Sequence, residues 1–198
     1  AAHVWFNDFD NYTSGQWTVT ETVGTATQAI TNGDGGLLAL VNSTSNNDLN
    51  AIQWANEIFT FETGKKSWGK ARFKIDDATS SALVCGLQVT DTTPLAVANG
   101  VYFRKSAGST TLNLVVCASS TETVTSLGAM SDGTNVVVGF AYDGASAITA
   151  YVNDVATAVS VTTNMPTVAL APSLAVSNGA TASKTLTVDY AMFAKERA

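Results

Sequence analysis

Histidine, cysteine and proline are all scarce in this chain of 198 residues, which contains one, two and three of them. The single histidine, His3, stands among the first residues, so a serine–histidine–aspartate triad has no well-placed base. A structural zinc site takes four ligands, more than His3, Cys85 and Cys117 supply together. The sequence therefore indicates no metal and no cofactor.

Charged residues are scarce as well and make up 13 % of the chain. The formal net charge is −6. Binding to phosphate requires clustered cations, so a nucleic-acid partner is disfavoured. No apolar run approaches the roughly 18 residues of a membrane span, so no membrane partner is indicated. The start at Ala1, without Met or signal-peptide features, fits removal of an initiator Met or cleavage of a longer precursor.

Helical signals are also missing, since no stretch repeats apolar residues at helical spacing over ten residues. The chain has 28 threonines and only five glutamates, a bias that favours strands. Turn signals such as Asn99-Gly100 and Asp143-Gly144 recur about every 8–12 residues, a spacing typical of sandwiches and barrels. We therefore expect one all-β domain over residues 1–198, a two-sheet antiparallel sandwich of about 12–14 strands.

Several runs alternate cleanly between apolar and polar residues. In Lys70–Ile75 the apolar and the basic residues take turns, which places them on opposite faces of a strand. Asn153-Asp154 separates two further strand-like runs and predicts a two-residue hairpin turn. The aromatic residues of the segment 1–12 need burial, so this segment either packs on its own domain or extends as an arm to a neighbour.

The two cysteines are expected to stay unpaired. If the runs 81–90, 100–105 and 111–118 form a meander, Cys85 and Cys117 lie two strands apart, about 9.6 Å at the usual strand spacing. A disulfide needs Cα atoms within about 7 Å of each other. Two buried free thiols are the prediction.

No catalytic residues can be assigned, and the chain is predicted not to be an enzyme. A glycosidase needs two carboxyl groups about 5–9 Å apart, and only Asp8 and Asp10 have same-face spacing. That pair is expected to be a solvated turn, with a Ca²⁺ site as the alternative. The segment Gly64–Ala71 resembles a P-loop, but Ala71 stands where Ser or Thr would hold Mg²⁺ and a strand follows instead of a helix.

Two groups of residues are candidates for binding. Half of the ten basic residues lie in Lys65–Lys74, and four of them share parity and could form one cationic stripe: Lys66, Lys70, Arg72 and Lys74. This stripe is either a solvated sheet face or a contact for an acidic partner surface. Trp54 and Trp68 stand at strand ends, where exposed rings could offer flat platforms to sugars; burial in the core is the alternative for both.

Five segments resemble the concanavalin A-like (laminin G-like) jelly rolls that tailed phages encode. Gly64–Ile75 (GKKSWGKARFKI) looks like the family's Gly-Lys-x-x-Trp-x-x-Ala-Arg-Phe-Lys strand, and segments 86–95 and 99–105 resemble the next two blocks. Segment 139–153 is similar to the Tyr-Asp-Gly to Tyr-Val-Asn-Gly hairpin, with Asp154 in place of the final Gly. Leu186–Tyr190 looks like the last strand.

The resemblance implies a jelly roll of two curved sheets and, among phage relatives, a virion structural protein. Our leading hypothesis is a capsid decoration or cement protein, made in the host cytoplasm and bound on the capsid surface. Its partners would be the major capsid protein or copies of itself. The alternative is a lectin-like carbohydrate-binding module, perhaps used by the virion for attachment to host glycans. A divergent glycosidase comes third, because the glucanase Glu-x-Asp-x-(x)-Glu strand is absent.

Overall fold

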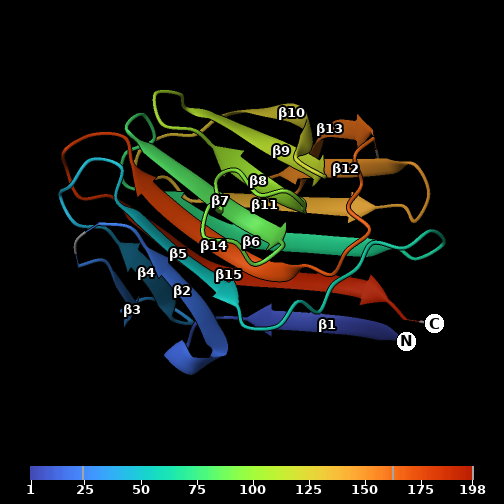
Figure 1. The fold of residues 1–198 in the computed structure, drawn as a ribbon, viewed down its shortest axis with the longest axis horizontal. Helices are drawn as coiled ribbons and strands as arrows, with labels where there is room; N and C mark the ends of the chain where they lie inside the picture. Colours follow the sequence, from blue (N-terminus) through green and yellow to red (C-terminus); the bar gives the residue numbers. More distant parts are fainter. Residues whose placement is uncertain (24, 162, 198) are drawn as a thin grey trace.

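The computed structural model describes residues 1–23, 25–161 and 163–197, which form two antiparallel sheets packed face to face (Figure 1). Sheet A has eight strands: β1 (Ala2–Asn7), β3 (Thr27–Thr31), β4 (Leu37–Val41), β6 (Ser67–Ile75), β11 (Val136–Tyr142), β12 (Ala147–Val152), β13 (Val155–Val161) and β15 (Thr185–Glu196). Sheet B has seven: β2 (Trp17–Glu21), β5 (Leu49–Trp54), β7 (Ser81–Gln88), β8 (Gly100–Lys105), β9 (Thr111–Ala118), β10 (Thr121–Ala129) and β14 (Ala171–Asn178). The predicted all-β sandwich is confirmed.

The described residues hold fifteen strands, more than the 12–14 expected, and one 3-10 turn, η1 (Ser14–Gln16). The short strands β2 and β3 account for part of the excess. Most of their side chains are exposed on both faces, so they lack the apolar alternation by which strands are recognised in a sequence. Within the described residues there is no helix of the length and apolarity that a membrane crossing requires.

The strand order places β6 and β15 at the centre of sheet A, in the order β13-β12-β11-β6-β15-β4-β3. The twelve residues of β15 pair first with β4 and then, along Ala191–Glu196, with β1. The N-terminal segment therefore contributes a strand to its own sheet. Asn153 and Asp154 both have positive φ (50° and 64°) in the turn between β12 and β13, which matches the type I′ geometry of the predicted hairpin.

The core fills the space between the sheets with aliphatic side chains and a chain of aromatic rings. Trp5 and Trp17 are buried there, their ring centroids 6.0 Å apart in an edge-on arrangement. Phe193 stacks on Trp5 and continues the cluster towards Phe140. Edge-on and offset pairs of this kind add stability beyond the area they bury.

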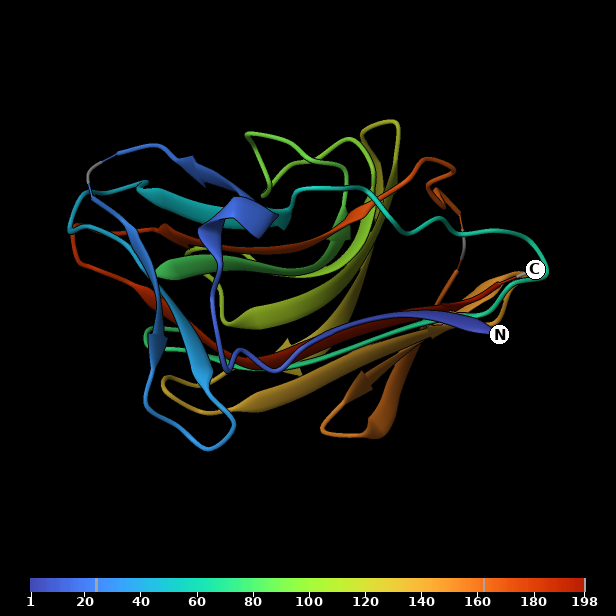
Figure 2. The same ribbon diagram turned by 90° about the horizontal axis from the view of Figure 1, so that it is seen from below.

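A second, smaller apolar cluster lies on the outer face of sheet B, beneath the connection between β7 and β8. This connection, residues 89–99, is called the strap below; it crosses the hollowed outer side of the sheet (Figure 2). Val84, Tyr102 and Cys117 of the sheet pack there against Val97 of the strap.

Cys85 and Cys117 are both free and buried, as predicted. Cys85 belongs to the core between the sheets, whereas Cys117 belongs to the cluster under the strap. The two thiols therefore lie on opposite faces of sheet B, which excludes a bridge in addition to their separation of two strands.

Candidate functional site

The outer face of sheet A collects most of the binding candidates along β6. Ser67, Gly69, Ala71, Phe73 and Ile75 are buried, and the residues between them point outward. These outward residues are Trp68, Lys70, Arg72 and Lys74, while Lys66 is exposed just before the strand.

Two of the cations of this face are paired with carboxylates. Lys70 Nζ lies 2.6 Å from Asp154 Oδ1, and Arg72 pairs with Asp189. The hydrogen bond to Asp154 raises the pKa of Lys70 above its usual value. Of the four residues of the predicted basic stripe, Lys66 and Lys74 make no ion pair within the described residues.

The strand register aligns two rows of side chains across five strands of this face. The first row runs through β12, β11, β6, β15 and β1 as Tyr151, Gly139, Lys70, Met192 and Phe6. Its members are directly opposite one another on neighbouring strands, where side chains are close enough to interact.

The second row lies beside the first and has the same strand order. It consists of Thr149, Ala141, Trp68, Ala194 and Val4. On β11 both rows carry a small residue, Gly139 or Ala141, and this strand lies between β6, which carries Trp68, and β12, which carries Tyr151.

These small residues open a hollow of about 290 Å³ on the outer face. Trp68 and Tyr151 border it from strands that are two positions apart, about 9.6 Å at the usual spacing. Gly139 and Ala141 form its floor, because Gly139 has no side chain and Ala141 only a methyl group. A Cβ added at Gly139 would lie 3.7 Å from the Cβ of Tyr151, so a larger residue there would enter the hollow.

The hollow combines apolar walls with few polar groups. Met192 and Val137 also line it, and the ion pair between Lys70 and Asp154 stands at its rim. Concave sites with aromatic walls and a few placed polar groups are typical of small-ligand binding. The sequence pointed to Trp68 and Lys70, but Tyr151 was missed because only the pairing of β11 with both β6 and β12 brings it there.

Trp54 does not share this site with Trp68. It is half-buried at the end of β5 in sheet B, with its ring centroid 5.6 Å from Trp5 and 5.2 Å from Trp17. Trp54 borders a different, more polar hollow of about 620 Å³, together with Asp8 and Asp10. Within the described residues there is no group of three His, Cys, Asp or Glu side chains that could hold a metal ion.

The outer face of sheet B is largely taken up by the strap, which buried polar side chains hold in place. Gln53 donates to the carbonyl of Val89 (3.1 Å) and accepts from the amide of Asp91 (2.8 Å). Gln88 donates to the carbonyl of Pro94 at 2.8 Å. Arg104 donates to Leu95 O at 3.2 Å. The sequence did not predict these contacts between the sheet and the strap, because a single Gln in a strand does not indicate which backbone groups it will bind.

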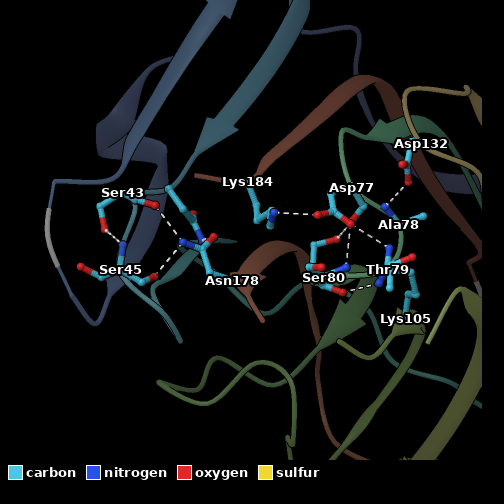
Figure 3. Close-up of polar contacts among 12 residues, drawn as sticks. Ser43, Ser45, Asp77, Ala78, Thr79, Ser80, Lys105, Asp132, Asn178 and Lys184 are labelled. Carbon is cyan, nitrogen blue, oxygen red and sulfur yellow. Dashed lines mark hydrogen bonds and ion pairs between the residues drawn. The ribbon is translucent and has the colours of Figure 1, made fainter. Parts of the chain in front are cut away.

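One end of the sandwich is closed by polar contacts (Figure 3). Asp77 accepts hydrogen bonds from Lys184 Nζ (2.7 Å) and from the amide of Ser80 (2.7 Å), which lower its pKa to about 2. The fully buried Lys105 donates to backbone carbonyls, including those of Ser106 (3.2 Å) and Ser109 (3.1 Å). Burial lowers the pKa of Lys105 to about 8. These contacts join the loops at this end.

No protein-family model matches the sequence, and no curated protein matches it. Solved structures do match over nearly the whole chain. An endo-1,3-β-glucanase from Streptomyces sioyaensis has a TM-score of 0.68 at 11 % identity, with 98 % of this chain and 96 % of that chain covered. Peanut lectin has a TM-score of 0.63 at 10 % identity, with coverages of 99 % and 98 %. An endo-β-1,4-glucuronan lyase from Trichoderma reesei has a TM-score of 0.62 at 11 % identity, with coverages of 96 % and 94 %.

The fold is therefore the concanavalin A and legume-lectin type of jelly-roll sandwich, as the resemblance implied. Identities this low show the fold alone. The prediction that the chain is not an enzyme is overturned by these neighbours, because a glucanase and a lyase share the fold with a lectin. None of these three is described as a virion protein.

Proposed function

We propose that this protein binds carbohydrate in the hollow of sheet A, with Trp68 and Tyr151 as its main contacts. The observation that carries the proposal is the pair of aromatic side chains on either side of a floor made by Gly139 and Ala141. Sugar rings have apolar C–H faces that pack on aromatic rings, and hydroxyl groups at their edges that need hydrogen-bond partners. Trp68 and Tyr151 offer both an apolar body and a polar tip.

The ion pair at the rim suits the hydroxyl groups of a sugar. Lys70 donates and Asp154 accepts, and both keep exposed atoms, since their side chains are 38 % and 68 % accessible. A neutral sugar can therefore bridge the pair without leaving either charge buried and unpaired. The lectin and the carbohydrate-acting enzymes that share the fold also support a glycan ligand.

A glycan array followed by calorimetric titration of the strongest binders tests the proposal. We expect Trp68→Ala to abolish binding, because it removes the larger wall of the hollow. Tyr190→Ala is the matched control: Tyr190 is half-buried on the same sheet, opposite Arg72, but does not line the hollow. Absence of any glycan binding, or equal loss in both variants, would refute the assignment.

A structural role in a virion is the second candidate function, and it would place the protein on the capsid surface. The exposed side chains of Val4 and Phe6 support it, because they extend the apolar rows of sheet A to the rim of the molecule. Apolar groups at this position favour contact with another protein. Co-sedimentation with tailed-phage capsid shells stripped of their surface proteins tests this candidate, and Val4→Lys with Phe6→Lys should prevent it.

A further inference from the structure

The side chain of His3 lies on the inner face of β1, at the edge of the core. Alternate residues of a strand point to the same face, and Trp5, two residues further on, is buried between the sheets. The ring centroid of His3 is 4.9 Å from that of Phe59, a core residue that is 2 % exposed. His3 is also the only histidine of the chain, and histidine is the one residue type whose ordinary pKa, 6.5, lies between about pH 5 and pH 8.

The polar contacts of the His3 ring fit its neutral form. Arg197 Nη2 lies 3.1 Å from His3 Nδ1. A guanidinium only donates hydrogen bonds, so Nδ1 is the acceptor and the proton of the neutral ring is on Nε2. Nε2 itself is buried and has no hydrogen-bond partner within the described residues. An imidazolium carries a proton on both nitrogens, so protonation would direct an N–H at the Arg197 cation and leave a charged N–H buried without an acceptor.

The charged groups around His3 also disfavour the protonated ring. Lys195 stands opposite His3 in the register of β15, and Arg197 follows two residues later. Burial, Arg197 and Lys195 all lower the pKa of His3 below its usual value. Glu62 and Glu196 border the same hollow of about 340 Å³, but each has another partner: Glu62 Oε1 lies 2.6 Å from Lys195 Nζ, and Glu196 Oε2 accepts from a backbone amide at 2.8 Å. The charges that act on the ring are thus mainly positive.

The beginning of β1 is the segment that depends on these contacts. β1 pairs with β15 along Ala2–Asn7, has no other strand partner within the described residues, and forms the lower rim of the molecule beside the two termini (Figure 1). Arg197 holds its start twice, because its amide donates to Ala1 O at 2.9 Å and its guanidinium donates to His3. Further along the strand, Trp5 packs in the core. The first residues can therefore open at a lower free energy than the rest of the sandwich.

We propose that His3 makes this segment sensitive to pH, so that protonation of its ring releases residues 1–4 from β15 while the rest of the molecule stays folded. Because folding lowers the pKa of His3, its contacts contribute stability above the unfolded value of about 6.5, and this contribution is lost as the pH falls through the lower, folded value. Asp77 titrates far below this range, with a pKa of about 2. Release uncovers the ring of Phe59 and frees the backbone of β15 along Ala194–Glu196, so that in acid the sheet gains an edge open to another strand.

Amide hydrogen exchange followed by NMR tests the release. We expect the protection of residues 2–4, corrected for the intrinsic exchange rate, to fall several-fold between about pH 7 and pH 4.5. Since these residues open locally, at the lower pH they exchange much faster than the central strand β7, which opens only with the whole molecule. In His3→Gln, whose side chain stays uncharged and can accept from Arg197, the fall disappears. Equal protection of residues 2–4 at both pH values, exchange as slow as that of β7, or the same fall in His3→Gln overturns the proposal.

The titration of the ring itself distinguishes this role from a purely structural one. NMR follows the Cε1–H signal of the single histidine, and we expect its pKa to lie below the usual value. Arg197→Gln keeps a donor for Nδ1 but removes the cation, so the pKa of His3 rises and the pH dependence of the exchange weakens. Lys74→Gln is the matched control, because it removes a cation at the far end of β6 and leaves both quantities unchanged. A His3 pKa at or above the usual value, or an equal shift in the two variants, contradicts the proposal. This inference does not depend on glycan binding.

Discussion

Lys70 and Asp154 lie 2.6 Å apart, and their ion pair connects the middle of β6 to the turn between β12 and β13. The pair spans β11, the strand that carries the floor of the hollow. It brings a donor and an acceptor to one rim of an otherwise apolar depression, and both remain accessible to solvent.

The ion pair should matter more for ligand binding than for folding. Exposed ion pairs contribute about 0–1 kcal/mol to stability, so Asp154→Asn should change the free energy of unfolding by less than ~1 kcal/mol. The same variant should weaken glycan binding, because the asparagine is uncharged and accepts hydrogen bonds less strongly than a carboxylate. Urea unfolding and calorimetric titration measure the two effects. A large loss of stability with unchanged affinity would contradict this role.

Filling the hollow should abolish binding without removing any polar group. Ala141→Leu puts a larger apolar side chain on the floor between Trp68 and Tyr151. Ala194→Leu is the control, since Ala194 lies on the other side of Trp68 in the same row and does not line the hollow. We expect loss of glycan binding in the first variant only. Equal affinities in the two variants would show that the ligand binds elsewhere.

Stability should fall in acid in a way that depends on Asp77. Its pKa is lowered to about 2 by Lys184 and the amides of Ser80 and Thr79. A lowered carboxyl pKa contributes stability above the unfolded value of about 3.8, and this contribution is lost as the pH falls towards 2. Asp77→Asn should therefore remove about 1–2 kcal/mol at neutral pH and less at pH ~2.5. Urea midpoints at both pH values measure it, and the same difference at both would contradict the linkage.

The alternation of Lys70–Ile75 was sufficient to predict which residues of β6 point outward. Successive side chains point to opposite faces in every β-strand, whatever its neighbours are. The partners of those residues could not be predicted in the same way. Asp154 and Asp189 reach β6 only through the order β12-β11-β6-β15, which no local pattern specifies. The hollow likewise depends on Gly139 and Ala141 of β11. Their role can be recognised only when the neighbouring strands β6 and β12 are known.

Removal of the hydrogen bonds that Gln53 makes to the strap should let the strap open before the whole molecule unfolds. Gln53→Leu leaves the part-buried carbonyl of Val89 and amide of Asp91 without their partner, a cost of up to about 1–3 kcal/mol where water does not replace it. Opening exposes Cys117, whose thiol lies 3.4 Å from the carbonyl of Val97, whereas Cys85 stays in the core.

Thiol labelling under native conditions distinguishes the two cysteines. Burial raises the pKa of Cys85 to about 12 and also raises that of Cys117, so neither should react in the unmodified protein. In the Gln53→Leu variant we expect Cys117 to be labelled first, as a Cys117→Ser control would verify. Simultaneous labelling of both thiols would mean that only global unfolding exposes them.

The position of the ligand is tested most directly by following the four tryptophan indole N–H signals in two-dimensional NMR during titration with an oligosaccharide selected by the array. The Trp68 signal is assigned by its disappearance in Trp68→Phe. The account predicts that the Trp68 signal shifts with ligand, while those of the buried Trp5 and Trp17 hardly move. A titration in which no indole signal shifts, or in which only that of Trp54 does, would contradict binding in the hollow of sheet A.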